Sequence, residues 1–190
     1  KMNFRDLTAD DIECRVQSVK QNGLVLLLYK NARVDMNILD EAVGAENWQR
    51  EHYECKGNLF CRVGICCKMN IDESGNNGDI LSPSWAWKSD CGTESNTEAQ
   101  KGEASDSFKR ACFNWGIGRE LYTSPFIWIP ARYCRIENGK CYDKFAVEKI
   151  IIENKRITAV SILNTSIEGD RKEQRCFVWQ EKKNEADRQN

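Results

Sequence analysis

Two adjacent cations, Lys109 and Arg110, are the residues in this chain whose types and spacing best suit a binding reaction. They lie in the stretch EASDSFKRACFNWGIGREL, residues 103–121, just before an apolar turn. A lysine offers a mobile point charge, and an arginine offers a planar fork that holds a phosphate through two hydrogen bonds. Bases near the end of a helix that begins with acids, here Glu98 and Glu103, also match the helix dipole. From the pair alone, a helix-end charge is the commoner interpretation and a phosphate ligand is the alternative.

Signatures of enzymatic chemistry are missing from the sequence. His52 is the only histidine, which leaves almost nothing for His-dependent triads or HExxH zinc chemistry. The glycines of Gly116-Ile117-Gly118 follow a predicted helix, whereas a phosphate-binding loop precedes one. No pair of carboxylates is singled out for acid–base catalysis or metal-assisted hydrolysis. We therefore expect a protein that is not an enzyme and needs no cofactor.

The ten cysteines are scattered along the chain without a CxxC pair. Several stand where a small apolar residue fits, as Cys112 does, so we expect free thiols used as buried filler in a reducing compartment. The alternative is a zinc site formed by Cys55, Cys61, Cys66 and Cys91. Because structural zinc sites normally use close pairs of ligands, no metal is expected.

Length and charge limit the class of protein. A chain of 190 residues suits one domain, or one domain with an extension, and 41% apolar with 30% charged residues is typical of a soluble globular protein. The longest apolar run, residues 24–29, is too short to span a bilayer, so no membrane contact is expected. The 28 basic and 29 acidic residues nearly cancel, whereas nucleic-acid-binding proteins usually have a basic surplus. Any polyanion site must therefore be a local patch.

The first part of the chain is predicted to form a hairpin and a helix. Asn22-Gly23 separates two apolar runs, and both central residues of a type I′ turn need positive φ. Strands near 14–20 and 24–30 should therefore pair antiparallel. The next segment has an apolar stripe at helical spacing, so it should form a helix that ends at Gly44. The stripe consists of Val34, Ile38, Leu39 and Ala42.

A three-stranded antiparallel meander is predicted over about 48–89. Apolar residues alternate after a turn at Lys56-Gly57-Asn58, which gives the period of two that strands require. Trp85 and Trp87 share one face of the third strand, where either core packing or a stacking surface for bases would account for them.

The segment 98–116 is predicted to be a long helix, capped by Thr97 and ended by Gly116. Its apolar face consists of Ala104, Phe108, Ala111, Cys112 and Trp115. The residues expected to point away are Glu103, Asp106, Lys109, Arg110 and Asn114. Beyond it, a hairpin that turns at Glu153-Asn154-Lys155 and a strand at 175–180 complete the pattern. The expected fold class is α+β: an antiparallel sheet, made of hairpin and meander, packed against the long helix, with a C-terminal β extension.

This order of elements resembles the single-strand annealing domain of the Rad52/Rad22 family, in particular its smaller phage and bacterial versions. YKNARVDMNILDEAVGAENW is similar to the family's strand, its helix opened by a basic residue, and the aromatic residue that begins the next strand. TEAQKGEASDSFKRACFNWG is similar to its signature helix. The resemblance covers about residues 8–130. It implies an oligomeric ring whose positively charged groove holds single-stranded DNA by its phosphates and leaves the bases exposed for pairing.

The resemblance also implies which residues bind nucleic acid. Arg33 matches the basic residue that opens the family's second helix. Lys109 and Arg110 match the basic pair of the family's inner groove.

Two positions depart from the family pattern. Phe113 stands where some members carry a further basic residue, and Asp90 stands where a basic residue leads into the signature helix. The nearest substitutes are Lys56 and Lys101. With Arg33, Lys109 and Arg110, these two lysines complete the predicted nucleic-acid-binding set.

We expect residues 1–133 to form a Rad52-like annealing core, and residues 134–190 to form a β-hairpin extension with a charged tail, in the same domain or as an appendage. The expected function is single-stranded DNA binding and ATP-independent annealing in recombination and repair, in the cytoplasm of a bacterium or a phage-infected cell. A single-strand-binding protein or a recombinase is the candidate protein partner. The alternative is an oligomeric protein-interaction module without annealing activity, in which the basic pair only caps a helix.

Overall fold

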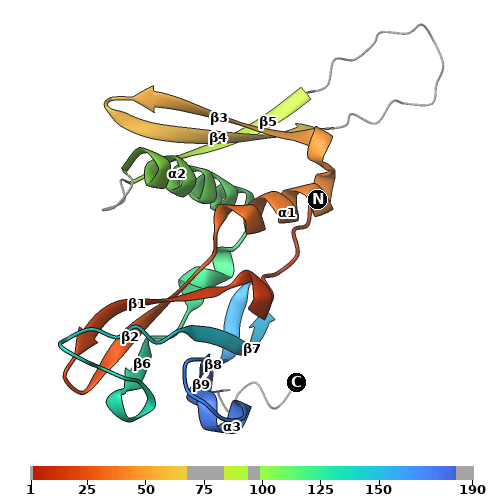
Figure 1. The fold of residues 1–190 in the computed structure, drawn as a ribbon. Helices are drawn as coiled ribbons and strands as arrows, with labels where there is room; N and C mark the ends of the chain where they lie inside the picture. Colours follow the sequence, from red (N-terminus) through yellow and green to blue (C-terminus); the bar gives the residue numbers. More distant parts are fainter. Residues whose placement is uncertain (1, 68–83, 94–98, 183–190) are drawn as a thin grey trace, which may run out of the picture. The chain divides into compact units, whose positions relative to one another are not determined.

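The computed structural model describes residues 2–67, 84–93 and 99–182, apart from the side chains of residues 99–101 (Figure 1). Contacts divide the chain into two units, each built from two stretches of sequence. The meander unit comprises Lys1–Arg5 and Ala32–Gly118, and the six-strand unit comprises Asp6–Asn31 and Arg119–Asn190. Each unit has its own antiparallel sheet, which confirms the predicted α+β class. Among the described residues, none of the helices combines the length and hydropathy needed to cross a membrane.

The meander unit has the predicted sheet, in the order β3 (Trp48–Cys55), β4 (Asn58–Cys67), β5 (Ser84–Cys91). The β3–β4 turn is formed by Lys56 and Gly57, whose φ values of 52° and 77° are those a two-residue type I′ turn requires. Two helices belong to this unit, α1 (Ala32–Val43) and α2 (Ala99–Trp115), with the short 3₁₀ turn η2 (Ala45–Asn47) after α1.

Helix α1 follows the predicted stripe over most of its length. Val34, Ile38 and Leu39 are buried, whereas Ala42 is exposed, so the stripe ends one turn earlier than predicted. Gly44 ends the helix as predicted, because its φ of 87° lies in the left-handed region and its N–H donates to the carbonyl of Asp40 at 2.9 Å.

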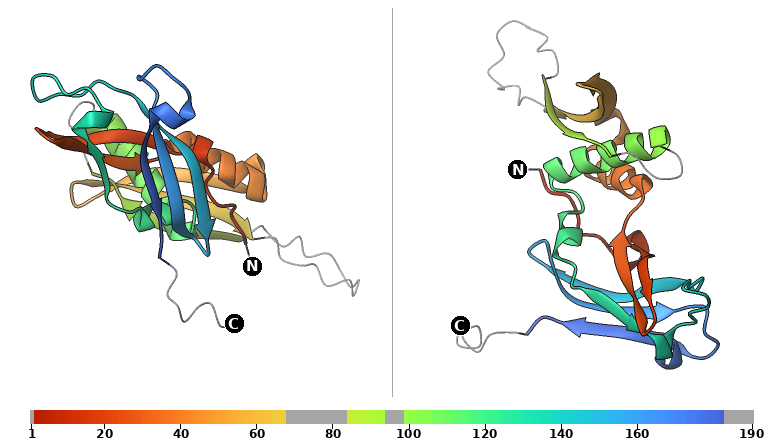
Figure 2. Two further views of the ribbon diagram at one scale, coloured as in Figure 1. Left: turned by 90° about the horizontal axis from the view of Figure 1, so that it is seen from below. Right: turned by 90° about the vertical axis from the view of Figure 1, so that its left-hand side faces the viewer.

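The six-strand unit joins the two ends of the sequence in one sheet, which Figure 2 shows from two further sides. Its strand order is β6-β2-β1-β7-β8-β9, and the two outermost strands contact each other, so the sheet is nearly closed. The strands are β1 (Glu13–Lys20), β2 (Gly23–Tyr29), β6 (Ile127–Pro130), β7 (Phe145–Glu153), β8 (Arg156–Asn164) and β9 (Arg175–Gln180). The short helices are η1 (Ala9–Asp11), η3 (Arg119–Thr123), η4 (Ala131–Tyr133) and α3 (Arg171–Gln174).

This sheet places the hairpin of β1 and β2 with the C-terminal strands β7–β9 and not with the meander. Leu24 and Leu26 of β2 and Ile157 and Ile162 of β8 are buried in the same core cluster. The predicted C-terminal hairpin and last strand are confirmed, with Asn154 and Lys155 at positive φ in the β7–β8 turn.

The first hairpin pairs as predicted, but its turn does not have the predicted geometry. Lys20 pairs with Gly23, so the loop residues are Gln21 and Asn22, and neither Asn22 nor Gly23 has a positive φ. A side chain at Gly23 would collide with the ring of Trp128 on β6. The glycine is therefore explained by the close approach of β6 and not by turn conformation.

A buried carboxylate makes the stability of the six-strand unit depend on pH. Arg175 donates to both oxygens of Glu148, at 2.8 and 2.6 Å, and the hydroxyl of Ser161 donates to the same carboxylate at 2.9 Å. The bonds from Arg175 lower the pKa of Glu148 to about 2, against the opposing effect of burial. When folding lowers the pKa of a carboxyl, the carboxyl stabilises the folded protein at pH values above its ordinary pKa. This contribution is lost as the pH falls toward the pKa in the folded protein.

We therefore expect the wild-type protein to lose more stability than Glu148→Gln when the pH falls from about 6 to about 3. At the higher pH, Glu148→Gln should lower the free energy of unfolding, because the half-exposed Arg175 loses its charged partner. Urea unfolding of both proteins at the two pH values measures this. An equal loss in both proteins would contradict the assignment to Glu148.

Candidate nucleic-acid interface

Helix α2 is fixed to the meander by the apolar face that the sequence predicts. Phe108, Ala111 and Cys112 are fully buried. The ring of Phe108 stacks with that of Trp48 at a centroid distance of 6.1 Å. Near the C-terminal end of the helix, the indole N–H of Trp115 donates to a β4 carbonyl at 2.9 Å. These contacts define which side of α2 is turned away from the sheet.

The end of α2 follows directly after this anchored turn. Gly116 has a φ of 100°, and the N–H of Ile117 donates to the carbonyl of Cys112 at 3.1 Å. The predicted C-terminal glycine is thus confirmed. The predicted N-terminal cap, Thr97, lies outside the described residues.

Lys109 and Arg110 lie on the last two turns of α2, and both are half-buried. The Nε of Arg110 donates to Asp106 at 2.9 Å, and the arginine side chain keeps 40% of its surface exposed. Asp106 also accepts hydrogen bonds from the backbone and hydroxyl of Thr93, at 3.0 and 3.1 Å. Burial alone would raise the pKa of Asp106, but the bonds from Arg110 and Thr93 outweigh it and lower that pKa. Asp106 therefore remains ionised and holds the guanidinium in one place.

Three polar residues of α2 that were predicted to point away contact the end of the sheet or the chain beyond it. Asp106 binds Thr93, Glu103 accepts from the N–H of Leu59 at 3.0 Å, and Asn114 donates to the carbonyl of Ser89 at 2.9 Å. Strand ends and the edge strand β5 present backbone groups that need partners, and polar side chains on the flanks of a helix supply them. The outward orientation predicted for these three residues is therefore wrong.

The other predicted cations are distributed over the meander unit. Arg33 is exposed in the first turn of α1, and α1 packs against α2. Lys56 is exposed at the tip of the β3–β4 hairpin. Lys101 belongs to α2, and its side chain lies outside the described residues.

Two cations that the sequence interpretation missed, Arg50 and Lys88, lie on the face of the sheet that carries α2. Both are paired with the buried Val63 of β4, Arg50 from β3 and Lys88 from β5. The Arg50 guanidinium lies 4.7 Å from the ring centroid of Phe108, and the Lys88 ammonium lies 5.3 Å from that of Trp115. Alternation from Trp48 could have placed Arg50 on this face, but the register that brings Lys88 opposite Val63 needs the structure.

The two departures from the family pattern have clear positions. Asp90 accepts a hydrogen bond from the backbone N–H of Cys91 at 2.8 Å, so its carboxylate is part of the end of β5. Phe113 is half-buried one turn after Lys109.

The cysteines do not converge on a metal site. Cys61 and Cys66 point to opposite faces of β4, so they cannot share a tetrahedral ion with Cys55 and Cys91. All ten cysteines are free thiols, and the described residues contain no group of three or more potential metal ligands.

These features define an α+β protein in which a helix with a paired lysine and arginine is fixed to one face of a β-meander. The sequence pattern of the Rad52/22 family double-strand break repair protein matches residues 4–137, from before β1 to beyond β6. The match covers more than half of the chain, and the protein therefore belongs to this family of double-strand break repair proteins. Members of the family are generally annealing proteins without catalytic activity. No curated protein and no solved structure matches the chain.

Proposed function

We propose that this protein binds single-stranded DNA and anneals complementary strands without ATP, as an oligomeric ring of the phage or bacterial type. The observation that carries the proposal is the position of Lys109 and Arg110 on the anchored turns of α2, within the segment that matches the repair family. Arg33 on the adjacent helix α1 is the third cation assigned to the site.

The chemistry of such a site is contact with the phosphate backbone. Sequence-independent pairing requires that the bases stay free, so a protein that anneals strands must hold them by their phosphates. Arg110 offers a guanidinium that Asp106 holds in place, and Lys109 offers an ammonium at the neighbouring helix position. Arg50 and Lys88 add positive charge on the face of the sheet that carries α2.

Annealing on this account comes from proximity and charge neutralisation. Two anionic strands that are held extended on one surface meet more often than two strands in solution. Because the strands are held through contacts between cations and phosphates, the binding should weaken as salt is added.

The test is the annealing rate of two complementary labelled oligonucleotides in EDTA without ATP. We expect the protein to accelerate annealing at low salt, and the acceleration to decline as salt is added. Failure to bind single strands even at low salt would contradict the proposal, and would favour a protein-interaction module built on the same fold. Light scattering tests the ring, which a monomeric mass would contradict.

A further inference from the structure

The six-strand unit contains a pocket of about 660 Å³, within the range typical of ligand sites. One wall is the end of β1 and its turn, residues 19–21. The other wall is formed by Ala131 and residues 134–139. Among the described residues, the lining contains none of the cations assigned to nucleic-acid binding, so the inference below does not rest on the proposed function.

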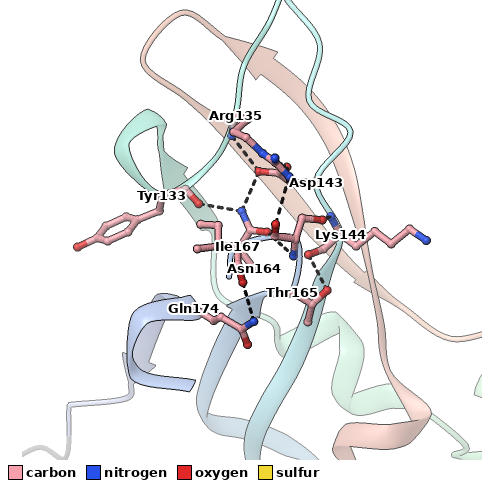
Figure 3. Close-up of polar contacts among 9 residues, drawn as sticks. Tyr133, Arg135, Asp143, Lys144, Asn164, Thr165, Ile167 and Gln174 are labelled. Carbon is pink, nitrogen blue, oxygen red and sulfur yellow. Dashed lines mark hydrogen bonds and ion pairs between the residues drawn. The ribbon is translucent and has the colours of Figure 1, made fainter. Parts of the chain in front are cut away.

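The second wall is held in place by a buried polar network, which Figure 3 shows. Asp143, whose side chain is 3% exposed, accepts from the backbone N–H of Arg135 and from the amide of Asn164, both at 2.8 Å. Asn164 is fully buried and also donates to the carbonyl of Tyr133 at 2.9 Å. Burial alone would raise the pKa of Asp143, but the bonds from Asn164 and Arg135 lower it, so the carboxylate stays ionised.

The same network positions a cation at the pocket. The Arg135 guanidinium donates to Asp143 at 3.0 Å and to the carbonyl of Ser166 at 3.2 Å, yet 65% of the side chain is exposed. Lys20 supplies a second, exposed cation from the opposite wall. Among the described lining residues, Glu137 is the one acidic residue, and Val19, Cys134 and Ile136 are the larger apolar ones. The lining thus carries two cations and one carboxylate beside its apolar residues, and Asp143 behind the second wall balances the charge of Arg135.

The first wall is an open strand edge. β1 pairs with β7 at Glu13↔Ala146, and no other register pair joins these two strands in the described part of the chain. The pocket touches Val19 and Lys20, two successive residues that point to opposite faces, where β1 ends. A strand edge offers backbone N–H and C=O groups in alternation, which an extended peptide can pair with.

We propose that this pocket binds an extended acidic peptide segment of a partner protein. The peptide backbone adds to the open edge of β1, its carboxylates lie at Lys20 and Arg135, and an apolar side chain rests on Ile136. Single-stranded nucleic acid fits less well, because none of the described lining residues is aromatic and bases would have no ring there on which to stack.

The experiment uses the full chain and a short fluorescent peptide that alternates aspartate with leucine. Fluorescence anisotropy should show saturable binding, and Lys20→Glu should weaken it about tenfold, because a contact with a carboxylate becomes a repulsion. The matched control is Lys140→Glu, an exposed lysine in the β-turn at the end of the second wall that does not line the pocket. This control should bind the peptide as the wild-type protein does. Thermal unfolding of both variants checks that they are folded.

Two further probes separate the recognition modes. A peptide with N-methylated amides keeps its charge but cannot pair with a strand edge, so it should bind about tenfold more weakly. A peptide that alternates lysine with leucine should not bind. Equal binding of the acidic and basic peptides, or equal effects of Lys20→Glu and Lys140→Glu, would overturn the proposal. A competition experiment with oligothymidylate gives one more test. The proposal would also be overturned if oligothymidylate displaced the acidic peptide from the wild-type protein but not from Lys20→Glu. The pocket would then be a site for nucleic acid.

Discussion

Replacing both Lys109 and Arg110 by glutamate is expected to abolish annealing. Two attractive contacts with phosphate become two repulsive ones, and the annealing rate at moderate salt should fall by about 100-fold or more. The measurement is the joining of complementary labelled oligonucleotides in EDTA without ATP, with circular dichroism to confirm that the helices remain.

The matched control carries the same change of charge on the six-strand unit. Lys140→Glu combined with Lys172→Glu reverses the charge of two exposed lysines that belong to neither helix of the meander unit. This double variant should anneal strands as fast as the wild-type protein does. If the two double variants lost the same fraction of the annealing rate, the rate would depend on the net charge of the protein and not on Lys109 and Arg110. If the variant with both Lys109 and Arg110 replaced annealed strands at the wild-type rate, the assignment of these two residues to DNA binding would be wrong.

The milder change of both residues to alanine gives a second, independent measure. Each lost phosphate contact on a single strand removes about 0.7 from the slope of log affinity against log salt, so this double variant should lose about 1.4. A helix-end charge that never touches DNA would leave the slope unchanged.

Loss of the Arg110–Asp106 pair by itself costs too little stability to explain the expected effect on annealing. The Arg110–Asp106 pair is partly exposed on both sides, and such pairs contribute about 0.2–1 kcal/mol. The anchoring residue Phe108 is not changed at all.

The local elements could be predicted from the sequence because each depends on neighbouring residues. Alternating apolar residues placed the meander strands, and Gly44 and Gly116 marked the ends of the two helices. The sheet partners could not be predicted in this way. Pairing of β1 with β7 joins residues more than 100 positions apart, as the pair Glu13↔Ala146 shows, and no periodicity carries that information.

The candidate site was predicted in part, for a related reason. Helical spacing distinguishes the buried face of α2 from the rest, and Phe108, Ala111 and Cys112 are buried as predicted. It does not tell which polar residues on the flanks meet a strand end, so the contacts of Glu103 and Asn114 were missed. The assignment of Lys109 and Arg110 to DNA remains a prediction that the annealing experiment tests.

Phe108 connects the stability of the meander unit with the site, because it holds the turn of α2 that carries Lys109. Its side chain is fully buried, stacked with Trp48 and covered by the Arg50 guanidinium. We expect Phe108→Ala to lower the free energy of unfolding by about 3–5 kcal/mol, since it removes a ring and leaves a cavity that the sheet fills only in part. Urea unfolding followed by tryptophan fluorescence measures the change.

The matched control is Phe113→Ala, the same substitution on the same helix at a half-buried position. It should cost clearly less than Phe108→Ala, because the ring already contacts solvent and its removal leaves no closed cavity. Phe108→Leu keeps most of the buried volume and should cost less than about 1.5 kcal/mol. If Phe108→Ala and Phe113→Ala were equally destabilising, the two rings would be equally important for holding α2, and the assignment of Phe108 as its main anchor would be wrong.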